Sequence, residues 1–234
     1  MFRDLIVRAA AMPPSQCAVC RVWPTPQPVC EDCVAEFAQP EPRCHTCALP
    51  VSGGVARCGA CVLAPPPLDH CLAGVGYAFP WQDLVMNFKF HDHPGWASLF
   101  ALILQSMPGV ESALADADVV LPMPLSKARL RHRGFNQALE LARALDAAKT
   151  RARLLLRIKD TPAQSLLDRA ARLTEVQGAF AVDPLRVAEI RGQRVVLVDD
   201  VMTSGATLFA AARAVRSAGA AHVTGVVFSR TPRE

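Results

Sequence analysis

The segment from Val195 to Thr207 constrains the fold of this chain more than any other part of the sequence. It reads Val-Val-Leu-Val-Asp-Asp-Val-Met-Thr-Ser-Gly-Ala-Thr, and an apolar-periodic stretch follows from Leu208 to Ala218. A continuous run of branched apolar residues is typical of a strand that is buried on both faces, as in a parallel sheet. The segment therefore predicts a buried strand, a short loop and the start of a helix.

The polar residues of this segment predict where a ligand binds. In open α/β sheets, ligands lie beyond the carboxyl ends of the strands, where Asp199 and Asp200 are expected. Ionised carboxylates only accept hydrogen bonds, which suits the hydroxyls of a sugar. Backbone amides at a helix N-terminus suit a phosphate, and the residues placed there are Thr203, Ser204, Gly205, Ala206 and Thr207. Together these groups predict a ribose 5-phosphate site.

Two other interpretations of the segment are weaker. An ordinary strand end with a capped helix does not require two adjacent acids before Thr-Ser-Gly-Ala-Thr. A P-loop is excluded, because Gly-x4-Gly-Lys-Ser/Thr is absent and the loop contains no lysine.

The cysteine spacing predicts metal binding near the N-terminus. Eight of the nine cysteines form four Cys-x2-Cys pairs, which are Cys17/Cys20, Cys30/Cys33, Cys44/Cys47 and Cys58/Cys61. Two pairs complete a tetrahedral site with four thiolates, so the four pairs predict two structural Zn2+ sites. Sequential and crossed pairing both satisfy the spacing. Redox dithiols are the weaker interpretation, because they normally occur singly on a βαβ unit. We expect Cys71 to be a buried core thiol.

Composition divides the chain into two predicted domains. Residues 1–67 hold eight of the nine cysteines and eleven of the nineteen prolines. From residue 68 onward strand and helix patterns alternate, which predicts an α/β fold with a mainly parallel sheet and helices on both faces. We therefore expect an N-terminal helix and four-cysteine zinc-ribbon module in residues 1–67, and the larger domain in residues 68–234.

Periodicity predicts the individual elements. Strands are expected at 72–79, 118–121, 153–158, 179–182, 194–198 and 222–228. Helices are expected at 1–11, 81–90, 96–107, 135–145 and 208–218. The net charge of +4 is too small to indicate nucleic-acid binding by itself, and no apolar run is long enough for a membrane span. Residues 1–11 lack the apolar core of a signal peptide, so we expect a cytoplasmic protein.

Basic residues elsewhere could complete the site. Lys127, Arg129, Arg131 and Arg133 follow the strand expected at 118–121, and arginine matches phosphate oxygens well. Arg133 is the best placed of them, because the glycine after it permits close approach of the backbone to an anion. A solvated basic loop or helix start explains the same residues equally well.

Two further stretches have two interpretations each. Lys89 lies among aromatic residues, so it is either a positioned anion ligand or a snorkelling side chain. The polar stretch 161–172, which includes Gln164 and Arg169, is either a mobile lid over a charged substrate or an exposed helix.

These motifs together resemble the competence protein F (ComF) family of phosphoribosyltransferase-like proteins. The paired cysteines, Phe88–Phe90, Arg133–Gln137 and the motif of residues 199–207 match in order along the chain. The last of these motifs is shared with all type I phosphoribosyltransferases. Met123 and Met202 depart from the pattern, since valine and threonine are common at these positions.

The resemblance implies a type I phosphoribosyltransferase-like fold with five parallel strands, a zinc-bearing module and a hood above the ligand. The implied ligand is phosphoribosyl pyrophosphate, which carries Mg2+ itself. Asp199 and Asp200 would hold the ribose hydroxyls, and residues 203–207 would hold the 5-phosphate. Residues 122–133 would face the pyrophosphate, and residues 164–172 would form the lid.

Two functions follow from the resemblance. The first is transfer of phosphoribosyl to an unidentified acceptor, with Asp199 and Asp200 as catalytic residues. The residues expected to bind substrate are the loop 203–207, Lys89, Arg129, Arg133, Gln164 and Arg169. The alternative is a non-catalytic competence accessory factor for single-stranded DNA uptake in natural transformation, with DNA or competence-machinery proteins as partners. Few aromatic residues are available to stack on bases, which weakens a direct contact with DNA.

Overall fold

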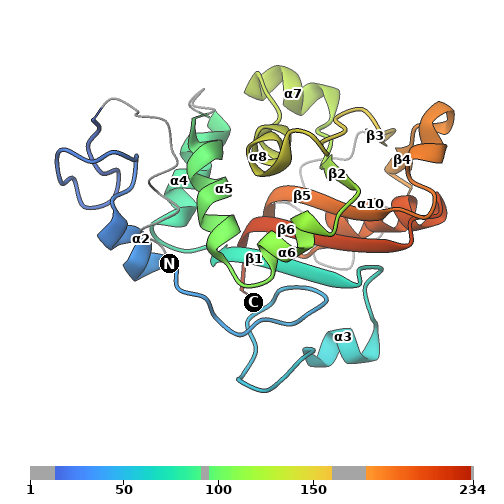
Figure 1. Ribbon diagram of the computed structural model, residues 1–234, viewed down its shortest axis with the longest axis horizontal. Coiled ribbons are helices and arrows are strands. Elements are labelled where there is room, and N and C mark those ends of the chain that lie inside the picture. Colours follow the sequence, from blue (N-terminus) through green and yellow to red (C-terminus); the bar gives the residue numbers. More distant parts are fainter. Residues whose placement is uncertain (1–13, 91–94, 160–177, 233–234) are drawn as a thin grey trace.

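A four-stranded, all-parallel sheet forms the centre of the molecule (Figure 1). The computed structural model describes residues 14–90, 95–159 and 178–232. The strand order is β1-β6-β5-β2, and the strands are β1 (His70–Gly76), β2 (Val119–Pro122), β5 (Arg194–Met202) and β6 (His222–Arg230). The predicted strand at 194–198 is therefore the first half of a longer strand. The long apolar runs of β5 and β6 are buried on both faces, as their composition predicted.

Helices cover both faces of the sheet, which confirms the predicted fold class. One face packs against α4 (Trp81–Phe90), α5 (Trp96–Ser106) and α8 (Gln137–Asp146), and the other packs against α10 (Ala206–Ser217). Alternation along β5 creates the two faces, since Val196 and Val198 point toward α8 while Val195 and Leu197 point toward α10.

Shorter elements complete the fold. They are α2 (Glu31–Phe37), α3 (Gly59–Leu63), α6 (Val110–Ala115), α7 (Lys127–Arg133), β3 (Leu155–Arg157), β4 (Phe180–Val182) and the 3-10 turn Pro184–Glu189. The strands β3 and β4 pair antiparallel in a separate two-stranded sheet.

The expected fifth parallel strand is wrong for the described residues. The chain beside β2 forms a single parallel bridge, between Thr150 and Val120. Its backbone accepts from Val120 at Lys149 and donates to Val120 from Arg151, and then it turns away toward β3. Where a fifth strand would pair with β2, the described chain therefore contributes a single bridged residue, Thr150.

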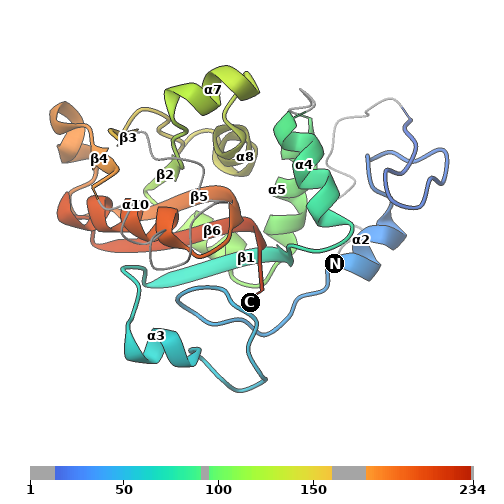
Figure 2. The same cartoon turned by 180° about the vertical axis from the view of Figure 1, so that it is seen from behind.

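The two cysteine-rich segments lie against different parts of the sheet (Figure 2). The segment around Cys17 and α2 packs with α4 and α5, whereas the segment around Cys44 and α3 packs on the α10 face. Each segment thus shares a hydrophobic cluster with the larger part of the chain, and the domain boundary at residue 67 stays a prediction.

Two predictions lie outside the described residues: the helix at 1–11, and the lid at 161–172, which includes Gln164 and Arg169. Within the described residues, no helix is long and apolar enough to cross a membrane. The cytoplasmic location stays a prediction.

Candidate functional site

Asp199 and Asp200 lie where the sheet opens beside β5. The pairing of β2 with β5 ends at Pro122 and Val198, whereas β6 stays paired with β5 as far as Met202. The two carboxylates therefore belong to the strand itself, not to a loop after it as we expected from the sequence. They lie directly beyond the carboxyl end of β2, which is where ligands bind in open parallel sheets.

A cavity of about 140 Å3 at this edge brings most of the predicted site residues together. Residues 199–203 and 205–208 of β5, the loop and α10 form one wall. Lys89 of α4, Arg129 and Arg133 of α7, and Arg157 of β3 add positive charge. One cavity thus combines carboxylates, a loop at a helix N-terminus and four basic side chains.

Lys89 is held in a buried ion pair with Asp200, and its role as a ligand for a substrate anion stays a prediction. Its Nζ lies 3.1 Å from Asp200 Oδ2, and the two side chains are 14% and 10% exposed. Burial alone would raise the pKa of Asp200, but the charges of Lys89 and Arg133 outweigh burial and lower this pKa. Asp200 is therefore ionised near neutral pH. Within the described residues this buried Oδ2 has no polar partner besides Lys89.

Asp199 differs from its neighbour. Burial, together with the negative charge of Asp200, raises the pKa of Asp199 to about 8. Oδ1 of Asp199 accepts a hydrogen bond of 2.9 Å from the amide of Asp200, and Oδ1 of Asp200 accepts one of 2.8 Å from Val201. Near neutral pH the pair thus carries one proton, on Asp199, beside one ionised carboxylate.

The loop before α10 has the geometry of an anion cradle. Gly205 precedes the helix with a φ of +83°, and a Cβ there would lie 2.6 Å from Met202 Cε. Only glycine fits this position without strain. The amide of Ala206 donates to Ser204 Oγ at 3.3 Å, so the Ser204 hydroxyl caps the first turn, and Ser204 does not line the cavity. The N-terminus of this twelve-residue helix favours a negative ligand.

The predicted basic loop is a helix in the structure, α7. Ser126 caps it by accepting from the amide of Arg129 at 3.3 Å, and Gly134 ends it. The helix orients Arg133, whose Nη1 donates 3.0 Å to Oε1 of the buried Gln137. Arg129 and Arg133 line the cavity, whereas Lys127 and Arg131 are exposed and do not. The helix therefore presents only part of its positive charge to the site.

Two larger hollows lie elsewhere in the described part of the chain. One, of about 360 Å3, is lined by the residues that begin β1, β5 and β6, and the other, of about 350 Å3, adjoins it near Arg43. Both involve the amino-terminal half of β1, not the carboxyl edge at which open parallel sheets bind ligands. In the first hollow, Asp69 pairs with Arg216, and Asp116 pairs with Arg194.

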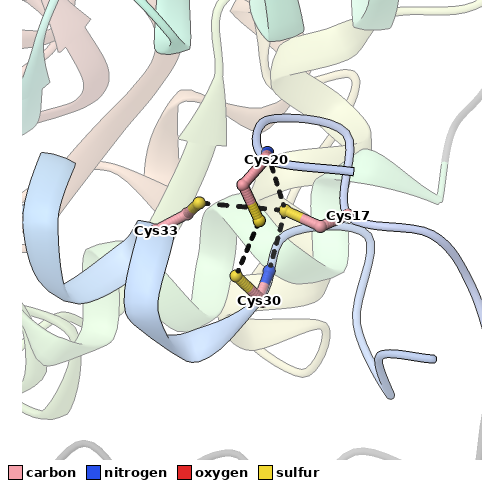
Figure 3. Close-up of side chains that lie close together, drawn as sticks. All are labelled: Cys17, Cys20, Cys30 and Cys33. Carbon is pink, nitrogen blue, oxygen red and sulfur yellow. Dashed lines mark hydrogen bonds between the residues drawn. The ribbon is translucent and has the colours of Figure 1, made fainter. Parts of the chain in front are cut away.

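The cysteines form two clusters by sequential pairing, which resolves the alternative left open by the spacing. The first cluster contains Cys17, Cys20, Cys30 and Cys33 (Figure 3), and the second contains Cys44, Cys47, Cys58 and Cys61. Within each cluster the sulfurs lie within 4.8 Å of one another. Both clusters could hold a metal ion.

The sulfur spacing fits a tetrahedral ion. Zinc–sulfur bonds of about 2.3 Å place the sulfurs of a tetrahedral site about 3.8 Å apart. The sulfurs of Cys17 and Cys33 are 3.9 Å apart, those of Cys20 and Cys30 are 3.6 Å apart, and those of Cys47 and Cys58 are 3.7 Å apart.

Backbone amides prepare one sulfur of each cluster for metal binding. Cys30 and Cys58 donate to the sulfurs of Cys17 and Cys44, at 3.4 and 3.3 Å. Burial alone would raise the pKa of both acceptor thiols, but the amide donors outweigh it and lower each pKa to about 6. The thiolate, which is the form that binds metal, is thereby favoured.

Comparisons with known proteins agree with this geometry. Residues 132–234 match the family model of the phosphoribosyl transferase domain. The chain is 30% identical over 152 residues to Competence protein F of Haemophilus influenzae, covering 61% of this chain and 65% of that protein. It is 36% identical over 103 residues to Competence protein ComFC of Bacillus subtilis, covering 44% and 40%. These matches support a ComF-family phosphoribosyltransferase-like protein.

A further relative carries a different name. DNA utilization protein YhgH of Escherichia coli (strain K12) is 28% identical over 165 residues, which cover 68% of this chain and 71% of that protein. The parallel sheet, the matched domain and the two cysteine clusters together make a type I phosphoribosyltransferase-like fold with an N-terminal zinc-ribbon module.

Two residues of the candidate site, Arg157 and Gln137, were not predicted from the sequence. Arg157 lines the cavity, and its guanidinium lies 5.5 Å from the ring centre of Phe180. Gln137 orients Arg133, as described above. Alternation along the predicted strand at 153–158 was the only available signal for Arg157, and it does not distinguish a ligand from a surface charge. Gln137 lay within a family motif but had no role assigned.

Proposed function

We propose that this ComF-family protein binds phosphoribosyl pyrophosphate with Mg2+ in the cavity beside β5 and transfers its phosphoribosyl group to an acceptor. The observation that carries the proposal is the composition of that one cavity, in which Asp199 and Asp200 lie beside the loop 203–207. The loop would take the 5-phosphate, and the carboxylates would take the ribose hydroxyls. Lys89, Arg129 and Arg133 would neutralise the pyrophosphate.

The proposed reaction breaks the bond from C1 of the ribose to pyrophosphate and forms a bond from C1 to the acceptor, which loses a proton. Positive charge develops at C1 and negative charge on the leaving group. Basic side chains fixed before the reaction, such as Arg133 on Gln137, stabilise that negative charge without reorganising. Mg2+ bound to the substrate would add to this neutralisation, and the ionised Asp200 provides a carboxylate beside it.

We also propose Zn2+ as the ion of both cysteine clusters. Four thiolates in tetrahedral spacing are the donor set of structural zinc sites, which are closed to other ligands. Zinc would supply folding free energy to the cysteine-rich segments, whose own helices have only seven and five residues.

Calorimetry with phosphoribosyl pyrophosphate and Mg2+ tests the binding step. We expect the Asp199→Asn/Asp200→Asn variant to lose at least about a hundredfold in affinity, because the charged contact of Asp200 and the carboxyl contact of Asp199 are both removed. The matched control is Glu111→Ala/Asp116→Ala, which removes two exposed acids away from the cavity and leaves affinity unchanged. Absence of binding by the wild type, or equal affinities of the two variants, contradicts the proposal.

We propose as the alternative a non-catalytic accessory role in single-stranded DNA uptake, since relatives are named Competence protein F and DNA utilization protein YhgH. The exposed Lys127 and Arg131 on α7 offer a basic surface to a single strand. Mobility shifts with single-stranded DNA at increasing salt test this role. Binding that weakens with salt, together with no release of pyrophosphate when nucleobases or amines are supplied, favours the accessory role. Absence of a shift at low salt refutes direct DNA binding.

A further inference from the structure

Arg230, the last residue of β6, lies buried between the second cysteine cluster and the loop of the candidate site. It pairs in register with Met202 at the end of β5, and only 4% of its surface is exposed. It does not line the cavity. Neither of the functions described above uses this residue, and the chain buries a full guanidinium there.

The guanidinium joins backbone from three segments. Nε donates to the carbonyl oxygen of Cys47 at 2.9 Å. Nη1 donates to the carbonyl oxygens of Met202 at 3.0 Å, of Thr231 at 2.9 Å and of Thr203. A metal-cluster residue and the first residues of the loop are thus held by one side chain.

These bonds set the direction of the loop amides. In a trans peptide the N–H group points opposite to the carbonyl of the preceding residue. Carbonyls of Met202 and Thr203 that point toward Arg230 therefore direct the amides of Thr203 and Ser204 away from it. Met202 also lies directly beneath Gly205 and contacts Cys71, with 3.7 Å between the two sulfurs. The conformation of the loop 203–207 therefore depends on the contacts that Met202 makes with Arg230 and Cys71.

The charge of Arg230 points to the metal cluster. No carboxylate of the described residues forms an ion pair with it, in contrast to Arg43 of the same region, which pairs with Glu41. A buried cation without a counter-charge is costly. Four thiolates around one divalent ion carry a net negative charge. The loaded cluster beside Cys47 therefore supplies the missing counter-charge.

We propose that Arg230 is a positioning residue that couples metal occupancy of the second cluster to the conformation of the loop 203–207, and thereby to affinity for a sugar phosphate. The last step rests on the proposed function. Metal loss would free the Cys47 carbonyl, leave the guanidinium unpaired and release the Met202 and Thr203 carbonyls. The first cluster makes no hydrogen bond to Arg230 and would not act this way.

The experiment compares Arg230→Met with Arg230→Lys and with a matched control, Arg216→Met. Arg216 also bridges two elements, since it pairs with Asp69, but it lies beside the hollow at the other edge of the sheet. We expect Arg230→Met to weaken binding of phosphoribosyl pyrophosphate with Mg2+ by about tenfold, as is typical of coupling between two sites. Amide hydrogen exchange of residues 202–208 should accelerate by a similar factor. Arg230→Lys keeps the positive charge but not the planar set of guanidinium N–H donors. Its affinity and exchange rate should lie between those of the wild type and Arg230→Met.

A second set of variants, which removes metal from the second cluster, tests the coupling between that cluster and the loop 203–207. Cys58→Ala removes the most exposed ligand of the second cluster. Introduced alone, it should accelerate hydrogen exchange of residues 202–208. Combined with Arg230→Met it should add little, because both substitutions remove the same interaction. Additive acceleration, or wild-type exchange in Arg230→Met, overturns the inference.

The exchange measurement separates this inference from the proposed function. If the wild type binds no phosphoribosyl pyrophosphate, the proposed function fails, and exchange alone decides the coupling. Zinc content and circular dichroism establish that each variant is folded. If Arg230→Met does not fold, Arg230→Lys decides by the same two readouts.

Discussion

The two cysteine clusters share a local layout but contact different halves of the candidate site. In each, the third cysteine precedes a short helix and donates its amide to the sulfur of the first cysteine. The first cluster packs with α4, which carries Lys89 to Asp200. The second lies under the loop before α10, to which Arg230 connects it. The same cysteine motif is therefore connected to Asp200 through a helix in one case and to the loop 203–207 through one side chain in the other.

The length of each connection explains the difference. From the first cluster, the connection runs through α2, then the bond of 2.7 Å from Trp81 Nε1 to the Phe37 carbonyl, and then along α4. From the second cluster, one guanidinium spans the whole distance. Disturbances at the first cluster can be absorbed by apolar packing on the way, whereas those at the second cannot.

The largest loss of affinity and stability is expected for substitution of Lys89, the residue through which α4 contacts Asp200. Lys89→Met leaves the buried Asp200 without its cation, so affinity for phosphoribosyl pyrophosphate should fall about a hundredfold, and unfolding free energy at pH 7 should fall by about 3 kcal/mol. Denaturant titrations and calorimetry measure the two quantities. Arg143→Met, which breaks the exposed pair with Glu140, is the control and should cost less than about 0.5 kcal/mol.

The loss of stability in Lys89→Met depends on pH in a defined direction. The pKa of Asp200 is lowered in the folded protein, so its ionisation stabilises the fold above the ordinary aspartate pKa of about 3.9. This contribution disappears as pH falls through the lower, folded value. The difference between wild type and Lys89→Met should therefore be largest at pH 7 and shrink as pH falls toward the folded pKa of Asp200, because the unpaired, buried Asp200 of the variant takes up a proton first. A difference that is constant with pH would show that the ion pair is not its cause.

The next prediction compares how loss of metal from each cluster changes affinity for phosphoribosyl pyrophosphate. Cys20→Ala and Cys58→Ala each remove the most exposed ligand of one cluster, and each should lower zinc content by one ion. We expect about tenfold weaker binding of phosphoribosyl pyrophosphate in Cys58→Ala and a change below about threefold in Cys20→Ala. Calorimetry and metal analysis of the same samples provide the measurement. Equal losses in the two variants would remove the distinction between the clusters.

Local spacing made both clusters and the loop predictable from the sequence. Ligands three residues apart, or two acids before a hydroxyl-rich turn, are neighbours in the chain as well as in space. The pairing of the clusters needed the fold, because sequential and crossed pairing place the same residues at the same spacing. The basic stretch was predicted as a loop, because four cations obscured the helix-capping role of Ser126.

Contacts between distant segments could not be predicted. Lys89 meets Asp200 only because Phe88, the residue before it, packs on Phe100 and Phe135 and so fixes the rotation of α4. Arg230 resembles any basic residue near a chain end, and only the register of β6 with β5 brings it beneath Met202. Both interactions depend on sheet order and helix packing, which no local pattern encodes.

The smallest effect on binding is expected at the connection of the first cluster. Trp81→Phe removes the donor to the Phe37 carbonyl and leaves some space in a buried site, which should cost about 2 kcal/mol of unfolding free energy. Affinity for phosphoribosyl pyrophosphate should change by less than about threefold, because α4 keeps its other apolar contacts and Lys89 stays on Asp200. Hydrogen exchange of residues 202–208 should match the wild type. If exchange of that loop instead accelerated as in Arg230→Met, the first cluster would also control the loop, and the division of the site between the two clusters would be wrong.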